Sequence, residues 1–447
     1  MDNIKKLIDG SISTACGEFF KVQDKHLRER DIGEKTRALA RHFKINIDEV
    51  RTLKLIEGRY TTNTAKFNNT AYCLKQFLSR ETRIIEEKGN NFESDTESFD
   101  HPEYFRLAIA PGESVHVWFR ATIFFEWRGE MFCILFSPYG ADEIFIKTIA
   151  RTWDLLKEFQ DVFDEYRDKN HYLRGKKFIG LGSSFLPQGE YSRQDIVLPE
   201  GMEERIFADI NGVLKASPAL AKYGLNSKKG FIFAGAPGNG KTLLLKIIAN
   251  TVDATCILVP FDVERSIDVS RVFSLARLLA PTVIIFEDID LYAEERGHSR
   301  DTERLGLLMN ELDGMIDNRE IVVIATTNHL KKVENALQNR PGRFDRVYTF
   351  PNPDVNVRQR ILAHYIGRVP NRVSPQQVES LAEAFAGYSG AYLKELVNSG
   401  FAHAVLRDPE EPVLLFDDLT IYTKALQWKD DRNPIGFEIK TASSKEN

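Results

Sequence analysis

A glycine-rich segment that ends in a lysine and a threonine is the part of this sequence best suited to chemistry. Residues 235–242 fit the pattern G-x-x-x-x-G-K-[ST], with a short apolar run before them and another after them. Glycines let a loop turn tightly, so its amide groups converge on phosphate oxygens, and the following helix points its positive end at the same place. We therefore predict that Lys241 reaches the β- and γ-phosphates of a nucleoside triphosphate and that the Thr242 hydroxyl binds Mg²⁺. The predicted phosphate-binding residues are Gly235, Ala236, Pro237, Gly238, Asn239, Gly240, Lys241, Thr242 and Leu243.

Polar residues also follow two later apolar runs. Glu287, Asp288 and Asp290 end the run 283–286, and Asn328 follows the run 321–327. Such short β-branched runs are typical of buried parallel strands, whose carboxyl ends form the ligand-binding edge of an open α/β sheet. Two adjacent carboxylates at that edge can divide the work, one holding Mg²⁺ and one orienting water. Asn328 is suited to position that water or to contact the γ-phosphate.

The elements around these residues indicate a chain of more than one domain. From about residue 195, strands alternate with helices, which predicts an α/β fold with a parallel sheet. Before it, residues 115–127 alternate apolar and polar, a turn follows at 128–130, and 131–136 returns, so we predict a β-hairpin. Apolar residues at spacings of three and four between Trp153 and Tyr166 predict an amphipathic helix. Residues 36–50 weakly resemble a helix-turn-helix, although a plain helical hairpin is the favoured interpretation.

Composition restricts the classes of protein that remain. A length of 447 residues favours two or three domains, and a net charge of −5 gives no overall attraction to nucleic acid or anionic membranes. The four cysteines lie far apart, which argues against a zinc site or a secreted disulfide framework. Because we find neither a signal peptide nor 18 consecutive apolar residues, we expect no transmembrane segment and a cytoplasmic location.

Two further motifs resemble one family. Residues 335–346, with the core Arg-Pro-Gly-Arg-Phe-Asp-Arg, resemble the second region of homology of the classical AAA ATPases, and residues 387–397 are similar to a motif of their helical lid. The resemblance covers about residues 195–426, just over half of the chain. It implies a P-loop NTPase sheet with a helical lid, ATP and Mg²⁺ as ligands, and a homo-oligomeric ring such as a hexamer. It also implies that Arg340 and Arg343 reach into the neighbouring subunit's site and that Gly390 and Ala391 lie against the nucleotide.

The sequence departs from the family pattern in two places. The family's strand ends in Asp-Glu, whereas this chain has Glu287-Asp288, so by position Glu287 would serve Mg²⁺ and Asp288 would polarise water. This inverted pair resembles the branch that contains the mitochondrial complex-III assembly ATPase and its bacterial relatives. Residues 261–266 contain an aromatic residue but lack the glycine of the usual pore loop, which puts threading of an unfolded polypeptide in doubt. The sequence has no H-E-x-x-H, which excludes a fused zinc protease of the FtsH type.

These inferences combine into one expected organisation. We expect a helical N-terminal segment (1–80), an acidic linker (81–104), an α+β partner-binding domain (105–190), an AAA nucleotide-binding domain (191–352), a helical lid (353–430) and a C-terminal tail (431–447). The expected function is ATP hydrolysis coupled to remodelling or assembly of protein complexes, with the protein partner bound by the N-terminal region. Two alternatives remain: a slow ATP-dependent switch or scaffold in a defence or signalling complex, and, less favoured, a nucleic-acid motor or loader.

Overall fold

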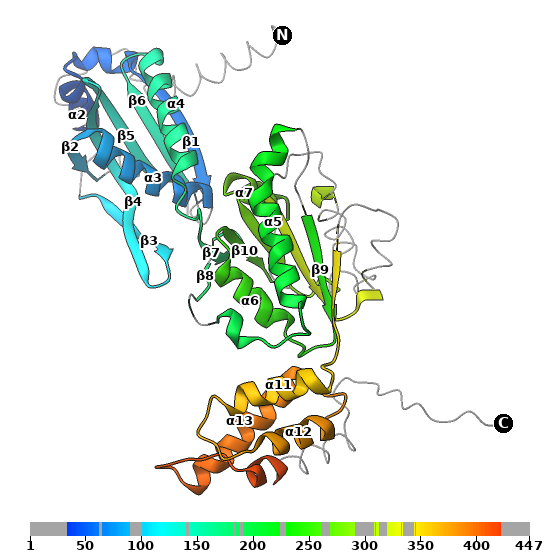
Figure 1. Cartoon of the computed structure of the whole chain (residues 1–447). Helices are drawn as coiled ribbons and strands as arrows, with labels where there is room; N and C mark the ends of the chain where they lie inside the picture. The colour runs from blue at the N-terminus through cyan, green and yellow to red at the C-terminus, as the bar shows by residue number, and fades with distance from the viewer. Residues whose placement is uncertain are drawn as a thin grey trace, which may run out of the picture. The chain divides into compact units, whose positions relative to one another are not determined.

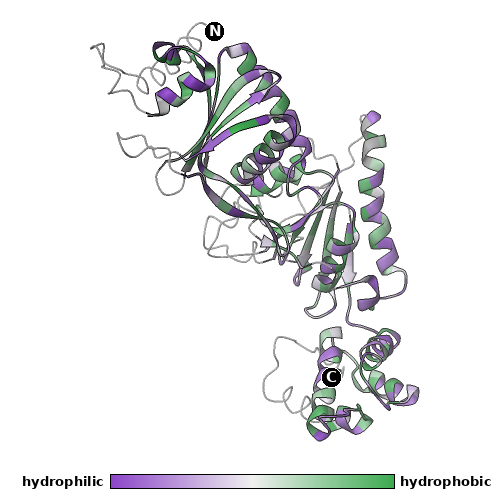
Figure 2. Cartoon of the chain, turned by 90° about the vertical axis from the view of Figure 1, so that its left-hand side faces the viewer, coloured by the Kyte–Doolittle hydropathy of each residue, from purple (hydrophilic) through white to green (hydrophobic). Residues whose placement is uncertain are grey.

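The chain divides into two compact units, Met1–Arg174 and Gly175–Asn447 (Figure 1). The structure is a computed structural model. It describes residues 34–61, 65–89, 101–139, 143–182, 184–187, 189, 191–223, 229–260, 269–290, 308, 310–312, 320–331, 333, 344 and 346–421. The helices of both units carry hydrophobic and hydrophilic residues in turn, as helices with one buried face do (Figure 2).

The first unit is built on an antiparallel sheet with the strand order β1-β6-β5-β4-β2, and β3 pairs with β4 beside this path. Its strands are β1 Lys54–Thr61, β2 Arg83–Lys88, β3 Glu103–Ala110, β4 Glu113–Trp127, β5 Glu130–Tyr139 and β6 Glu143–Ala150. Its helices are α2 Glu34–Phe43, the 3₁₀ helix η2 Ile47–Thr52, α3 Ala65–Glu81 and α4 Trp153–Lys169.

Helices cover both faces of this sheet. Neighbouring residues of a strand point to opposite faces, so apolar neighbours on one strand can pack against different helices. Phe124 of β4 packs in a cluster with Leu39 and Phe43 of α2. The next residue, Phe125, lies with its ring centroid 5.5 Å from that of Phe159 in α4. The predicted hairpin is confirmed as β4 and β5, and the predicted amphipathic helix as α4.

The structure differs from our expectations for residues 1–104 in three places. Residues 54–61 form strand β1, which pairs with β6, whereas we expected only helices there. Residues 83–88 form the edge strand β2 rather than a linker, because β4 supplies a hydrogen-bonding partner that composition does not reveal. The segment that resembles a helix-turn-helix has only the 3₁₀ helix η2 as its second element, and Val50 of η2 is buried against α2.

The second unit contains a sheet with the order β13-β9-β12-β11-β10-β7-β8, parallel except for the pairing of β7 with β8. Its strands are β7 Lys177–Ile179, β8 Ser184–Phe185, β9 Lys229–Gly235, β10 Thr255–Val259, β11 Thr282–Phe286, β12 Ile321–Thr327 and β13 Arg346–Phe350. Helices α5 Met202–Lys222, α6 Lys241–Thr251 and α7 Val269–Leu278 belong to the same layered region. Every residue of β11 and β12 is buried, which explains their continuous apolar sequences.

A helical lid follows the sheet and has its own core. Its main helices are α11 Val355–Ile366, α12 Pro375–Ala384 and α13 Gly390–Arg407. Leu362, Leu393 and Leu396 are among the buried residues that hold them together. The expected P-loop fold with a helical lid is therefore confirmed, whereas the expected tail (431–447) lies outside the described residues.

The boundary between the units also differs from the expected one. We placed it at residue 190, but β7 already pairs with β10 of the second sheet. The side chain of Lys177 donates a hydrogen bond of 2.9 Å to the carbonyl of Val252 and a second bond to that of Ala254. These contacts connect residues about 75 positions apart in the sequence, so local composition gave no sign of them.

Candidate nucleotide-binding site

The glycine-rich loop joins the end of β9 to the start of α6, which is the strand–loop–helix context that its sequence predicts. A Cβ atom on Gly235 would lie 2.1 Å from the carbonyl oxygen of Phe350, so β13 approaches β9 too closely for any side chain there. Gly238 has a φ of 80°, and a Cβ on it would lie 2.7 Å from the hydroxyl oxygen of Ser389 in the lid. The loop shape therefore depends on glycine for two separate reasons: close packing on β13 and close packing on the lid.

Lys241 is held inside this loop. It is only 6% exposed, and its Nζ donates hydrogen bonds to the carbonyls of Gly235 and, at 3.0 Å, of Ala236. Burial lowers the pKa of Lys241, and the nearby carboxylates of Asp288 and Asp290 partly oppose that shift. A partly desolvated ammonium group at the first position of α6 is a strong anchor for a phosphate.

Thr242 and Glu287 bring two oxygen donors together. Glu287 follows β11, and the neighbouring Thr242 hydroxyl favours the ionised form of its carboxylate. Burial and the neighbouring Asp288 raise the pKa of Glu287, which a bound cation would reverse. Hydroxyl and carboxylate oxygens are ligands that Mg²⁺ accepts, and Mg²⁺ commonly takes its remaining ligands from water and substrate phosphates. The donor set thus fits Mg²⁺. The described residues contain no group of three acids, histidines or cysteines that could hold a metal ion by itself.

Asp288 and Asn328 meet where β11 and β12 end. The Asn328 side-chain amide donates a hydrogen bond of 3.2 Å to the Asp288 carboxylate. Burial and the charge of Asp290 raise the pKa of Asp288, while Lys241 and Asn328 oppose the shift. A carboxylate and an amide side by side can accept a proton from water and orient it.

Lys241, Thr242, Asp288 and Asn328 border one cavity of about 670 Å³ between the sheet and the lid, whereas Glu287 is not among its lining residues. The predicted residues that line it are Pro237, Gly238, Asn239, Gly240, Lys241, Thr242, Leu243, Asp288, Asn328, Gly390 and Ala391. Ala391 also donates its backbone N–H to the Gly238 carbonyl at 2.9 Å, which ties the lid to the phosphate loop. The volume lies within the range of small-molecule and cofactor sites.

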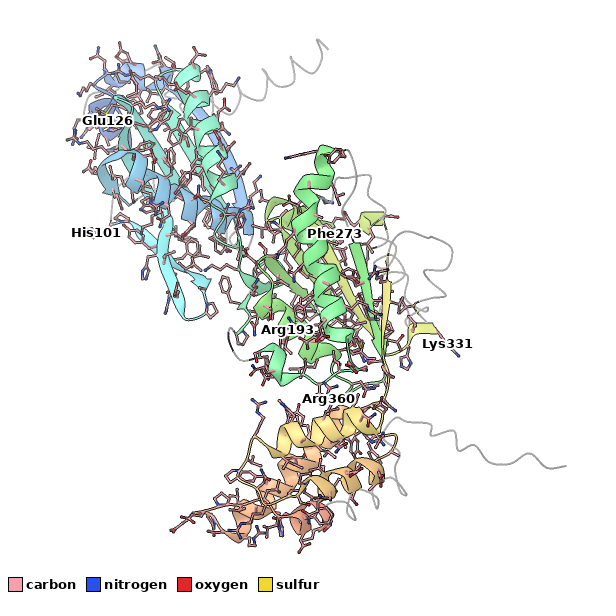
Figure 3. All side chains as sticks on the ribbon, viewed as in Figure 1. His101, Glu126, Arg193, Phe273, Lys331 and Arg360 are labelled. Atoms are coloured by element: carbon pink, nitrogen blue, oxygen red, sulfur yellow. The ribbon has the colours of Figure 1, made fainter. Side chains whose placement is uncertain are left out.

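The cavity also has lining residues that carry no sequence motif. Residues 195–199 line it, and Arg360 of α11 donates a hydrogen bond of 3.1 Å to the Leu198 carbonyl (Figure 3). Arg368 forms an ion pair with Asp195 at 3.0 Å, so this segment is attached to the lid twice. No motif marks this segment, because its place in the site depends on contacts with residues far away in the sequence, both in the lid and in the core where Ile196 and Leu198 pack.

Two further polar side chains in the cavity, Asn352 and His364, were not predicted. Asn239 donates its amide to the Asn352 side-chain oxygen at 2.9 Å. Among the described residues, the Oδ1 of Asn239 and the Nε2 of His364 are buried without a hydrogen-bond partner. Asn239 and His364 both line the cavity, so each has an unpaired polar atom beside the space where a ligand would bind. The other two expectations, Arg340 with Arg343 and the loop 261–266, lie outside the described residues.

A parallel sheet with this loop after one strand and acids after a neighbouring strand defines a P-loop nucleoside-triphosphatase. Residues 231–352 match the model of the family described as ATPase family associated with various cellular activities (AAA). The match assigns an AAA ATPase domain to this part of the chain.

Several curated proteins are similar to the chain. Protein SAV of Sulfolobus acidocaldarius is 34% identical over 250 residues, which cover 53% of this chain and 32% of that protein. Proteasome-activating nucleotidase of Aeropyrum pernix is 33% identical over 236 residues, covering 49% of this chain and 56% of that protein. ATP-dependent zinc metalloprotease FtsH of Buchnera aphidicola is 31% identical over 294 residues, covering 60% of this chain and 47% of that protein.

The similarity covers only part of this chain and only part of each relative. The chain spans between about a third and just over half of the length of these relatives. Within the ranges that the structure describes, no helix combines the length and the apolar character that a membrane span needs.

Proposed function

We propose that the chain hydrolyses ATP with Mg²⁺ as part of a ring-shaped homo-oligomer, a hexamer or similar ring, that remodels or assembles protein complexes. The observation that carries this proposal is the meeting of Lys241, the Thr242–Glu287 pair and the Asp288–Asn328 pair at one end of the parallel sheet. Together they offer a cation for phosphates, two oxygen donors for a metal ion, and a carboxylate with an adjacent amide for water.

Each group then has one role. Lys241 exchanges its two loop carbonyls for the β- and γ-phosphate oxygens of ATP. Thr242 and Glu287 would hold Mg²⁺, which would supply positive charge to offset the negative charge of the phosphates. Asp288 and Asn328 orient the attacking water in line with the γ-phosphate. Gly390 and Ala391 let the lid approach the nucleotide closely.

An isosteric pair of variants tests the division of roles between the two acids. Asp288→Asn keeps the shape of the side chain but removes the base, so we expect ATP to bind with near wild-type affinity while phosphate release falls by about 10²–10⁴-fold. Glu287→Gln weakens Mg²⁺-dependent binding instead. Fluorescent-nucleotide titration with and without Mg²⁺, together with phosphate release, distinguishes them. The reverse pattern would show that the two roles are exchanged.

The ring part of the proposal rests on Arg340 and Arg343. A guanidinium group from the next subunit would stabilise charge that spreads over the γ-phosphate oxygens during transfer, an effect of about 10³–10⁵ in rate in other systems. Arg343→Ala subunits should bind ATP without turnover, and so should Arg340→Ala subunits. Mixing Arg343→Ala with Lys241→Ala subunits should restore activity, because some sites then combine an intact loop with an intact arginine. A mixture that stays inactive would contradict action between subunits.

The measurement that tests the whole proposal is the ATPase rate as a function of protein concentration, with the mass determined at each point. We expect specific activity to rise steeply as a ring of subunits forms and to be lost on dilution. A monomer with constant activity at all concentrations would refute the ring. A protein that binds no ATP would refute the nucleotide site itself.

The N-terminal unit is the proposed partner-binding part, because it has a core and a sheet of its own. Asp288→Asn should retain protein partners in ATP that the wild type releases, which affinity capture of both proteins in parallel would measure.

The position of Asp288 also favours a second candidate, a slow ATP-dependent switch, because Asp is one methylene shorter than Glu and leaves the water farther away. Turnover far slower than that of a remodelling enzyme, with assembly that depends on ATP, would support the switch.

A further inference from the structure

The catalytic carboxylate stands on an unusual backbone conformation. Asp288 has a φ of 50°, in the left-handed region that side-chain-bearing residues rarely adopt. Asp and Asn enter this region more readily than other residues, because their short polar side chains can hydrogen-bond locally. A residue in this conformation persists only when its surroundings hold it there.

Thr326 of β12 provides the contact that holds this conformation. Its hydroxyl oxygen accepts the backbone N–H of Asp288 at 2.9 Å, and its carbonyl accepts the N–H of Ile289 at 2.9 Å. Thr326 is 2% exposed and lies on β12, two residues before Asn328, which follows the strand. One residue of β12 therefore fixes two consecutive peptide groups that follow β11.

A second connection links the same strand ends in the opposite direction. Asp290 is 3% exposed, and its carboxylate accepts the backbone N–H of Asn328 at 3.2 Å. The Asn328 side chain in turn donates a hydrogen bond to Asp288. The segment after β11 therefore positions Asn328, and β12 positions Asp288. Removal of the Thr326 hydroxyl would leave the Asp288 N–H without its partner, at the residue whose left-handed backbone most needs support.

We propose that Thr326 is a positioning residue for ATP hydrolysis, which holds the Asp288 carboxylate toward the γ-phosphate through the backbone of Asp288. This inference rests on the proposed role of Asp288. Valine at position 326 has the shape of threonine but accepts no hydrogen bond, so the Asp288 N–H loses its partner and the peptide relaxes toward the favoured right-handed region. The carboxylate then moves away, whereas the phosphate loop and the rest of the cavity remain as they are.

The test compares Thr326→Val with Thr326→Ser and with Thr282→Val in the full-length oligomer. Thr282 is a matched control: it is a buried threonine at the other end of the neighbouring strand β11, and its hydroxyl donates to the Ala276 carbonyl at 3.0 Å. We expect Thr326→Val to lower kcat about 10- to 100-fold, because displacements near 1 Å can cost this much, with KM and nucleotide Kd nearly unchanged. Thr326→Ser should restore most of kcat, and Thr282→Val should leave it unchanged.

The possible outcomes separate this inference from the proposed function. Wild-type kcat in folded Thr326→Val, together with inactive Asp288→Asn, would overturn the role of Thr326 and leave the proposed function intact. An equal loss of kcat in Thr282→Val would also overturn it, because the effect would then follow general destabilisation. An Asp288→Asn protein as active as the wild type would refute the role of Asp288 and this inference with it. If Thr326→Val does not fold, Thr326→Ala removes the same hydroxyl oxygen without placing a methyl group against the Asp288 N–H.

Discussion

The contact between the phosphate loop and the lid can be tested by adding a single methyl group at Gly238. In Gly238→Ala the new Cβ would lie 2.7 Å from the Ser389 hydroxyl oxygen and 3.0 Å from the Cβ of Ala391, at a backbone φ of 80°. The left-handed conformation costs alanine about 1–2 kcal/mol relative to glycine. Relief of the two short contacts requires the lid to move outward, at a cost of about 1–3 kcal/mol for an overpacked site. The total loss of folding free energy should therefore be about 2–5 kcal/mol.

Gly129→Ala separates the cost of the left-handed backbone from the cost of the short contacts with the lid. Gly129 lies in the turn between β4 and β5 with a φ of 81°, and a Cβ there would meet no atom within 4 Å. It therefore carries the backbone cost of about 1–2 kcal/mol without any contact with the lid. Urea unfolding measures both losses, and titration with a fluorescent nucleotide measures affinity.

Nucleotide affinity should distinguish the two variants most clearly. Because Ala391 donates its N–H to the Gly238 carbonyl, displacement of the lid removes one wall of the cavity. We expect Gly238→Ala to weaken nucleotide binding at least about tenfold, which corresponds to about 1.4 kcal/mol, and Gly129→Ala to leave it unchanged. Equal losses of stability and unchanged affinity in both variants would refute the argument that the loop and the lid are in tight contact at Gly238.

Three further predictions concern single side chains. Lys241→Ala should abolish detectable nucleotide binding in the same titration, and retained tight binding would contradict the phosphate site. Arg358 is buried and donates to the carbonyls of Ala382 (2.6 Å) and Pro353 (2.7 Å), so Arg358→Met should lose about 2–4 kcal/mol in urea unfolding by leaving both without a partner. Burial alone would raise the pKa of Asp418, but hydrogen bonds, first among them the one from a backbone N–H, hold it below the usual 3.8. The ionised carboxylate therefore stabilises the lid above about pH 4, and the stability advantage of wild type over Asp418→Asn should shrink as the pH falls below that value; an advantage that does not change with pH would contradict this.

Much of the nucleotide site could be predicted because its residues are close together in the sequence or follow directly after a strand. The loop from Gly235 to Thr242 is contiguous, and its glycines, lysine and threonine have fixed positions relative to one strand and one helix. The acids after β11 and the amide after β12 follow from a general property of parallel sheets, whose strands end at one edge. The roles of Arg340 and Arg343 remain predictions, because these residues lie outside the described ranges.

The sequence by itself determined the class of fold, the phosphate loop and the acidic strand end, because each depends on neighbouring residues and on a regular period of apolar side chains. Only the tertiary structure decided that residues 54–61 and 83–88 join a sheet, since strand pairing depends on partners such as β6 that lie about 90 positions away. It also decided that residues 195–199 and His364 line the cavity, and that Asp288 adopts a left-handed conformation on the Thr326 hydroxyl. Hydrogen bonds between distant segments fix these features, and no local pattern of residue types records which distant partners will meet.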